Sequence, residues 1–219
     1  MEEYRPTTEK RRIGLLGGTF DPIHYGHLLI AEEVSAVLDM AEMIFIPAGQ
    51  PPHKPGRVIT PAEHRLAMLE LAIASNPRFT ISLVEMKRPG LSYLVDTLHI
   101  LRSQVGTDVE LSFVIGWDSL EELHTWYKPQ GILEQLDALV AVGRPGYVDE
   151  GEYNNKQLEA RLPGITQRLR VVQTPQFSVS STDLRRRVAQ GRPIKYQVPE
   201  AVERYIFEHG LYVSDNKEL

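Results

Sequence analysis

The sequence of 219 residues contains no cysteine. Disulfide bonds, thiol nucleophiles and cysteine-ligated zinc are therefore excluded, and the composition favours a cytoplasmic protein. Long hydrophobic runs are also missing, because no apolar stretch approaches the roughly 18–20 residues that a membrane span needs. The first twelve residues are polar and include three glutamates. We interpret residues 1–12 as a disordered lead-in and not as a secretory signal.

An excess of positive charge is lacking as well, since 29 acidic residues outnumber 24 basic ones and give a net charge of −5. Proteins whose main partner is nucleic acid normally carry a basic surplus, so we expect neither a nucleic acid nor a membrane as partner. A small anionic ligand needs only a local positive pocket and stays compatible with this charge. The composition leaves open whether the chain forms a homo-oligomer.

Strand-like and helix-like segments alternate along the chain. Apolar runs predict strands at Ile13–Leu16, Met43–Pro47, Phe79–Val84, Val109–Ile115, Asp137–Val142 and Leu169–Val172. Helical spacing and terminal signals predict helices at Gly26–Leu38, Thr60–Ser75, Leu94–Leu101, Ser181–Gln190 and Pro199–His209. Strands separated by helices form βαβ units, so the expected fold class is α/β, with a Rossmann-like parallel sheet flanked by helices.

The alternation of these segments predicts a single domain over residues 13–213, in which residues 181–213 form a small helical C-terminal part. Hydroxyl side chains are expected to cap three helices; they are Thr60, Ser92 and either Ser180 or Ser181. The polar segment Gly146–Asn155 is interpreted as an exposed loop.

The residues suited to chemistry follow the predicted strands. Open parallel sheets bind ligands beyond the carboxyl ends of their strands, so segments that follow different strands can meet at one edge. Five such segments are present: Gly17–His27, Gln50–Lys54, Gly116–Asp118, Arg144 and Ser178–Arg185. We expect them to line one site.

The segment Gly17–His27 has the composition of a phosphate-binding loop. Gly17 and Gly18 allow a tight turn and a close approach of the backbone to a ligand, and Thr19 adds a hydroxyl. Gly26 stands at a predicted helix start, where unpaired N–H groups and the helix dipole favour an anion. A purely structural glycine turn is the alternative interpretation.

His24 and His27 are three residues apart and can share one face of the predicted helix. Both rings can donate hydrogen bonds to phosphate oxygens, and in the protonated form they add positive charge. Helix capping is one alternative role. A zinc site is another, although it needs a third ligand, for which His53 and His64 are the nearest candidates.

The pattern His-x-Gly-His at His24–His27 resembles the core signature of the nucleotidylyltransferase superfamily. The longer stretch Gly-Gly-Thr-Phe-Asp-Pro-Ile-His-Tyr-Gly-His-Leu is similar to the bacterial nicotinate-nucleotide adenylyltransferases. The resemblance covers residues 13–213. It continues at Pro51–Lys54, Ser92–Tyr93, Asp96–Leu98, Gly116 with Asp118, Trp126–Tyr127, Arg144–Tyr147, Ser180–Thr182 with Arg185, Tyr205–Ile206 and Gly210–Tyr212.

The resemblance implies a reaction that belongs to NAD biosynthesis. Nicotinate mononucleotide and ATP would give nicotinate adenine dinucleotide and pyrophosphate, through direct attack of the mononucleotide phosphate on the α-phosphorus of ATP. Mg²⁺ is expected to accompany the ATP phosphates and to be held mainly by them and by water, so no dedicated metal site of protein ligands is expected.

The resemblance also implies roles for individual residues. The catalytic candidates are His27, His24, Lys54 and Arg185, with His27 first for stabilising the transition state. The ATP-binding candidates are Gly17, Gly18, Thr19, His24, Gly26, His27, Gly116, Asp118, Ser180, Ser181, Thr182 and Arg185. The candidates for binding nicotinate mononucleotide are Thr19, Phe20, Lys54, Ser92, Tyr93, Leu94, Trp126, Tyr127 and Arg144.

Two positions depart from the pattern of the family. Trp117 stands where a small residue is usual, and Leu94 stands where threonine is common. The second departure bears on whether the substrate is nicotinate mononucleotide or its amide counterpart. For Lys54, Asp118 and Trp126 the alternative roles are a solvated loop charge, a helix cap and core packing, respectively.

Other classes of protein are weighed against this resemblance. Phosphopantetheine adenylyltransferases and cytidylyltransferases share the histidine signature but lack the Trp-Tyr and Arg-Pro-Gly-Tyr stretches. A dehydrogenase would need the full Gly-x-Gly-x-x-Gly spacing, which is absent. A non-catalytic nucleotide-binding module stays open, although both histidines, Lys54 and Arg185 are retained.

Overall fold

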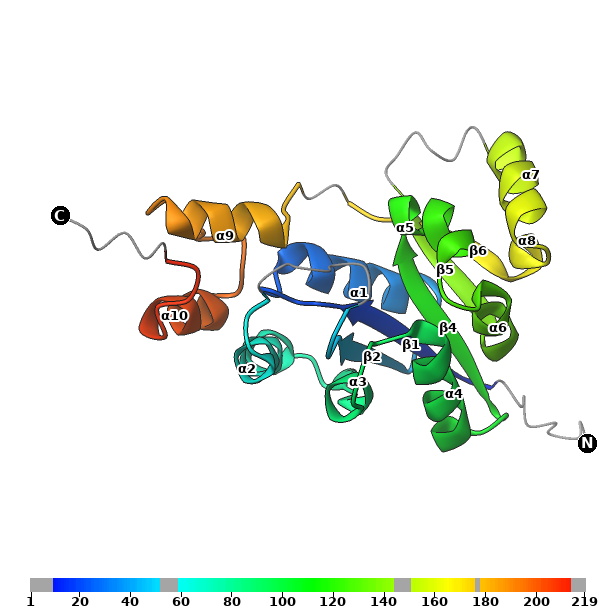
Figure 1. Cartoon of the computed structure of the whole chain (residues 1–219), viewed down its shortest axis with the longest axis horizontal. Helices are drawn as coiled ribbons and strands as arrows, with labels where there is room; N and C mark the ends of the chain where they lie inside the picture. The colour runs from blue at the N-terminus through cyan, green and yellow to red at the C-terminus, as the bar shows by residue number, and fades with distance from the viewer. Residues whose placement is uncertain (1–9, 52–58, 144–150, 176–177, 214–219) are drawn as a thin grey trace, which may run out of the picture.

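Six parallel β-strands form one sheet in the computed structural model, which describes residues 10–51, 59–143, 151–175 and 178–213 (Figure 1). The strands are β1 (Arg11–Gly18), β2 (Glu42–Pro47), β3 (Phe79–Ile81), β4 (Val109–Gly116), β5 (Ala138–Gly143) and β6 (Leu169–Gln173). Their order is β3-β2-β1-β4-β5-β6. The strand order reverses between β1 and β4, which is where open α/β sheets bind ligands. The predicted fold class is confirmed.

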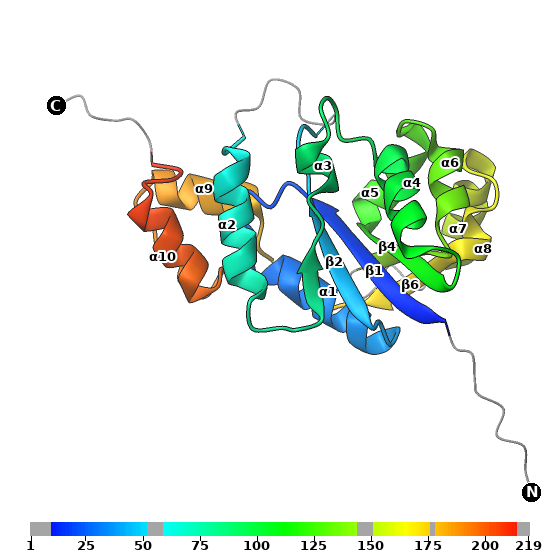
Figure 2. The ribbon, with the colours of Figure 1, turned by 90° about the horizontal axis from the view of Figure 1, so that it is seen from below.

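Helices cover both faces of the sheet (Figures 1 and 2). They are α1 (Tyr25–Val37), α2 (Ala62–Ile73), α3 (Val84–Lys87), α4 (Leu94–Val105), α5 (Trp117–Glu122), the 3₁₀ helix η1 (Leu123–Thr125), α6 (Pro129–Gln135), α7 (Gly151–Arg161), α8 (Ile165–Arg168), α9 (Ser181–Ala189) and α10 (Glu200–Glu208). Within the described ranges, none of these helices is both long enough and apolar enough to cross a membrane.

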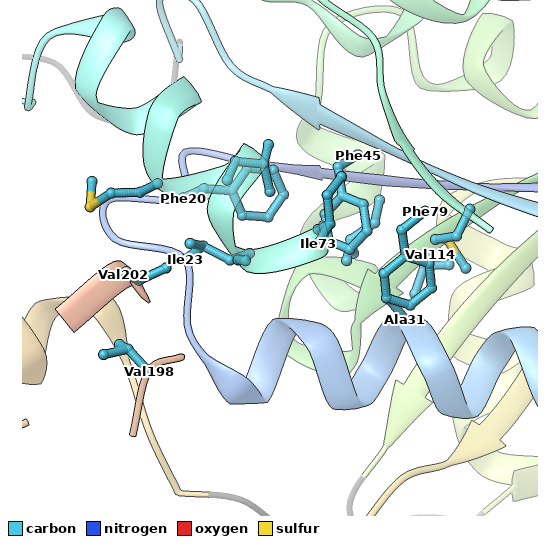
Figure 3. Close-up of a cluster of buried hydrophobic side chains, with 14 of the residues drawn as sticks. Phe20, Ile23, Ala31, Phe45, Ile73, Phe79, Val114, Val198 and Val202 are labelled. Carbon is cyan, nitrogen blue, oxygen red and sulfur yellow. The ribbon is translucent and has the colours of Figure 1, made fainter. Parts of the chain in front are cut away.

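Two hydrophobic cores lie on opposite faces of the sheet because successive strand residues point to opposite sides. Leu16 packs in the core shared with α1, α2, α9 and α10, whereas Leu15 packs in the core shared with α4 to α8. Figure 3 shows Phe20 and Ile23, from the loop between β1 and α1, near Val202. The C-terminal helices thus share a core with the loop that follows β1, and Figure 2 shows α10 beside α2.

Several predicted boundaries are corrected by the structure. The strand β1 begins at Arg11, inside the segment interpreted as a lead-in. The strand β3 ends at Ile81, since it pairs with β2 over only three positions, and Val84 already begins α3. In the segment Gly146–Asn155, interpreted as a loop, α7 begins at Gly151, while residues 146–150 lie outside the described residues.

Two of the predicted helix caps are wrong. The N-cap of α2 is Pro61, and Thr60 lies before it, with its backbone N–H donating to Asp21 and its carbonyl accepting from Arg65. The N-cap of α4 is Tyr93, and the hydroxyl of Ser92 accepts hydrogen bonds from two backbone amides of the loop after β2. The cap of α9 is confirmed, since Ser180 accepts from the N–H of Asp183.

A buried arginine on α2 joins the ends of two central strands. Arg65 is 2% exposed. Its Nη1 donates to the carbonyls of Thr19 at 2.9 Å and Ala48 at 2.7 Å, and its Nε donates to Thr60 at 2.9 Å. Burial lowers the pKa of Arg65, and the nearby Asp21 carboxylate opposes that shift. One guanidinium therefore satisfies three carbonyls of the loops that follow β1 and β2 and precede α2.

Replacement of Arg65 by methionine is expected to destabilise the protein by about 3 kcal/mol or more, because three carbonyls lose their donor and a buried carboxylate loses a neighbouring cation. Urea unfolding measures the change. The matched control is Arg78→Met, which removes an exposed ion pair with Glu32 and should cost less than about 1 kcal/mol. Equal stability of Arg65→Met and the wild type would contradict this role.

Candidate active site

Three adjoining cavities lie at the carboxyl edge of the sheet. The large cleft, of about 680 Å³, is lined by α1, α9 and the ends of β4 and β5. The small cavity, of about 310 Å³, is lined by the end of β1, the start of α4 and Trp126. The connecting cavity, of about 300 Å³, is lined by the loop after β1 and the start of α9. The predicted segments after β1, β4 and β6 therefore do meet at one edge.

His24 and His27 form a stacked pair at the start of α1. Their ring centroids are 3.8 Å apart, and the backbone N–H of His24 donates to Nδ1 of His27 at 3.3 Å. Because Nδ1 of His27 accepts this bond, the neutral ring carries its proton on Nε2. Both histidines line the large cleft and the connecting cavity. The contact thus prepares His27 Nε2–H as a donor.

His24 is uncharged near neutral pH. The side chain is buried, and desolvation lowers the pKa of its imidazole to about 4. Its Nδ1 is buried without a hydrogen-bond partner among the described residues. His24 therefore carries no positive charge in this structure, and its neutral imidazole can exchange a hydrogen bond with a ligand oxygen in the cleft.

Two glycines of this loop lie in tight surroundings, where an added Cβ would force neighbouring side chains to move. A Cβ at Gly18 would lie 2.8 Å from the ring of Phe20, and one at Gly26 would lie 3.0 Å from His24 and 3.1 Å from Val179. By contrast, a Cβ at Gly116, at the end of β4, would meet no atom within 4 Å. The first two glycines permit close packing around the histidines, whereas Gly116 leaves the large cleft open.

The start of α9 is fastened to the loop after β1. Ser181 Oγ donates to the carbonyl of Pro22 at 2.9 Å, and Arg185 Nη1 donates to the carbonyl of Asp21 at 2.6 Å. Ser180, Ser181, Thr182 and Arg185 line the connecting cavity. The hydroxyls of Ser180 and Ser181 thus have hydrogen-bond partners within the protein. The side chain of Arg185 is 26% exposed.

The small cavity joins the backbone at the end of β1 to an aromatic wall. Gly17, Gly18 and Thr19 line one side, and the other side includes Ser92, Tyr93, Leu94, Trp126 and Tyr127. The rings of Tyr93 and Tyr127 are 4.4 Å apart. Tyr93 caps α4 and Leu94 is its first residue, where backbone N–H groups have no acceptor within the helix. Such a cavity suits a planar ring that carries an anionic group.

Comparison with known proteins identifies the family. Residues 15–187 match the cytidylyltransferase-like family. Proteins named probable nicotinate-nucleotide adenylyltransferase are 50% identical over 92% of this chain in Thermomicrobium roseum and 48% identical over 91% in Roseiflexus, and the matches cover 91% and 97% of those proteins. The chain belongs to the nicotinate-nucleotide adenylyltransferase family. The resemblance read from the sequence is confirmed.

A solved structure supports the fold assignment of this nicotinate-nucleotide adenylyltransferase family member. The nicotinic acid mononucleotide adenylyltransferase of Plasmodium falciparum, complexed with NaAD, aligns with a TM-score of 0.72 at 17% identity. The alignment covers 92% of this chain and 97% of that one. At this identity the likeness concerns the fold.

The residues expected from the family to form the site differ in where the structure places them. Gly116, Asp118 and Trp117 line the large cleft. Phe20 is only 2% exposed and packs edge-on against His27 at 5.1 Å between ring centroids, so it supports the histidine from the core side. Lys54 and Arg144 lie outside the described residues, as does His53.

Four buried or half-buried polar residues near the site are not among the site residues predicted from the sequence, although Asp21 and Tyr212 lie within stretches that resemble the family. Glu85 lines the small cavity, accepts a hydrogen bond from Thr97 Oγ1 at 2.7 Å, and has its carboxyl pKa raised by burial. Arg65, Asp21 and Tyr212 meet only in the folded protein. Arg65 is buried in the folded protein, whereas an arginine on a helix is normally expected to be exposed to solvent.

The lowered pKa of His24 predicts how stability depends on pH. Its folded pKa of about 4 lies below the usual value of 6.5, so protonation favours the unfolded chain. This contribution is complete above pH 6.5 and is lost as the pH falls toward 4. Between pH 7 and pH 5 the loss should be about 2 kcal/mol, measured by urea unfolding.

His24→Gln should remove most of that pH dependence, because glutamine does not titrate. The matched control is His124→Gln, at an exposed position, which should keep the wild-type dependence. Identical pH profiles for the wild type and His24→Gln would show that burial of His24 does not govern acid stability.

Proposed function

We propose that the protein joins nicotinate mononucleotide and ATP to give nicotinate adenine dinucleotide and pyrophosphate. An oxygen of the mononucleotide phosphate forms a bond to the α-phosphorus of ATP. The bond from that phosphorus to the oxygen bridging the α- and β-phosphates breaks, and pyrophosphate leaves with the electron pair. No covalent bond to the protein is needed, so positioning and charge stabilisation supply the rate acceleration.

The shared lining of the three cavities is the observation that carries this proposal. Thr19 belongs to both the small cavity and the connecting cavity, and His24 and His27 belong to both the connecting cavity and the large cleft. Two substrates placed in the outer cavities would therefore bring their phosphates together beside the histidines. The relatives named above carry this activity in their names.

The large cleft suits ATP. Gly116 leaves room at the end of β4, and the exposed carboxylate of Asp118 can accept hydrogen bonds from ribose hydroxyls. The N-terminus of α1 and the guanidinium of Arg185 face the phosphate region with donors and positive charge. In this arrangement His27 Nε2–H stabilises the charge that develops between the phosphates.

The small cavity suits nicotinate mononucleotide. Trp126 offers an apolar face to the pyridine ring, and the first amides of α4, near Leu94, can receive its carboxylate. Contact through a backbone N–H does not require the hydroxyl of the threonine that is common in the family. The substitution by Leu94 is therefore compatible with the acid substrate.

Mg²⁺ enters in this proposal as part of the ATP substrate. Across the described ranges, no three histidine, aspartate or glutamate side chains are grouped to hold a metal ion. The side chains that line the cleft therefore fit an ion that is held by the ATP phosphates and by water, since Mg²⁺ commonly keeps several water ligands. When bound, it would neutralise part of the triphosphate charge.

A product assay tests the proposal. The protein is incubated with ATP, Mg²⁺ and either nicotinate mononucleotide or nicotinamide mononucleotide, and the dinucleotide and pyrophosphate are separated. Strong preference for the acid is expected. Equal use of both substrates would shift the assignment to a dual-specificity enzyme, and no product from either would refute it.

His27→Ala is expected to lower kcat by at least about 100-fold while the fold is retained, because a donor aimed at developing charge is lost. Steady-state kinetics and a thermal melt measure the two effects. His99→Ala, at an exposed position on α4, is the matched control and should leave kcat unchanged. Normal turnover of folded His27→Ala would remove His27 from this role.

Trp126→Ala is expected to raise the KM for nicotinate mononucleotide about tenfold or more and to leave the KM for ATP within twofold, because only the small cavity loses its aromatic wall. Separate substrate titrations measure both constants. A selective loss of ATP affinity would show that the two substrates are assigned to the wrong cavities.

A further inference from the structure

The loop after β1 is held from outside by a residue near the other end of the described chain. Tyr212 OH donates to Oδ1 of Asp21 at 2.8 Å, across 191 positions of sequence. Asp21 is 4% exposed, and its Oδ2 also accepts a hydrogen bond from the backbone N–H of Thr60 at 3.4 Å. The two hydrogen-bond donors to this buried carboxylate thus come from separate parts of the chain.

Asp21 stands between two groups that reach the reacting phosphates in the proposed function. On one side, its backbone carbonyl accepts from Arg185 Nη1 at 2.6 Å, and its Oδ2 lies 3.9 Å from the same atom. On the other side, the preceding residue Phe20 places its ring edge-on against His27. A shift of Asp21 would therefore displace both Arg185 and His27.

The backbone near this contact adopts conformations that need support. Phe20 has φ of 49° and Tyr212 has φ of 64°, both in the left-handed region that residues with a Cβ rarely occupy. Burial raises the pKa of the Tyr212 hydroxyl, and the Asp21 carboxylate raises it further. The hydroxyl therefore stays protonated and acts as a donor throughout the physiological pH range.

We propose that Tyr212 is a positioning residue for catalysis, which acts through Asp21 to hold His27 and Arg185 in their places beside the phosphates. Tyr212 is absent from the lining of the three cavities and has no direct role in substrate contact. Without its hydroxyl, Asp21 loses one donor, and the carboxylate draws the guanidinium of Arg185 away from the connecting cavity. This inference rests on the proposed function.

Tyr212→Phe tests the inference, because it removes only the hydroxyl. We expect kcat to fall about tenfold, while the dissociation constant of nicotinate mononucleotide, measured by calorimetry, stays within twofold because neither His27 nor Arg185 lines the small cavity. Tyr205→Phe is the matched control: Tyr205 OH bonds to Nδ1 of His64 at 2.9 Å on the far side of α2, and its loss should leave kcat unchanged. Wild-type kcat in folded Tyr212→Phe, or an equal fall in Tyr205→Phe, would overturn the inference.

A double-mutant cycle shows whether Tyr212 acts through Asp21. Asp21→Ala removes the acceptor of the tyrosine hydroxyl together with the charge, and it carries the test alone if Tyr212→Phe does not fold. Asp21→Ala should lower kcat at least as much as Tyr212→Phe, and the double variant should be no worse than Asp21→Ala, because Tyr212→Phe has no contact left to break there. Additive losses, or full activity of folded Asp21→Ala, would contradict the coupling.

Nuclear magnetic resonance of the histidine rings tests the contact independently of turnover. Tyr212→Phe should shift the ring signals of His24 and His27 and leave those of His64 in place, whereas Tyr205→Phe should do the reverse. Unchanged signals of His27 in Tyr212→Phe would refute the positioning role. A wild-type protein that makes no dinucleotide would refute the proposed function, and the ring signals would still decide the role of Tyr212.

Discussion

The buried guanidinium of Arg65 is the interaction on which the site depends. The loops after β1 and β2 leave the sheet at its binding edge, where their carbonyls have no neighbouring strand to pair with. Arg65 donates hydrogen bonds to the carbonyls of Thr19, Ala48 and Thr60, and these bonds hold the three loop segments in fixed positions relative to one another. A desolvated cation is tolerated there because it is hydrogen-bonded and lies near the Asp21 carboxylate. The position of the histidine pair follows from this arrangement.

The electrostatics of the site rest on donors and helix dipoles more than on charged histidines. Burial keeps His24 neutral, and the backbone N–H of His24 occupies Nδ1 of His27. A neutral, oriented imidazole can donate to a phosphate oxygen without first losing or gaining a proton, so it needs little reorganisation as charge develops. Within the described residues, Arg185 adds positive charge at the connecting cavity, and the N-terminus of α1 adds its dipole. This division of roles is consistent with a protein whose net charge is −5.

Local patterns predicted much of this structure, and non-local contacts account for the rest. The six strands, the parallel fold and the convergence of segments at one edge follow from apolar runs and glycine turns near Gly17 and Gly116. Thr60 and Ser92 were misassigned as caps because their hydrogen bonds go to the distant Asp21, Arg65 and the loop after β2. Short helices such as α3 and α6 were not predicted from the sequence, because so few residues show too little periodicity to recognise a helix.

The C-terminal helices complete the site as well as the core. Ser181 and Arg185 of α9 donate to the carbonyls of Pro22 and Asp21, and Tyr212 donates to the Asp21 side chain. The α9–α10 region also packs Val202 and Val198 into the core that contains Phe20 and Ile23 (Figure 3). A loop of one strand is thereby held on its outer side by a segment more than 150 positions away. The C-terminal segment therefore supports the loop that carries the histidines in addition to closing the core.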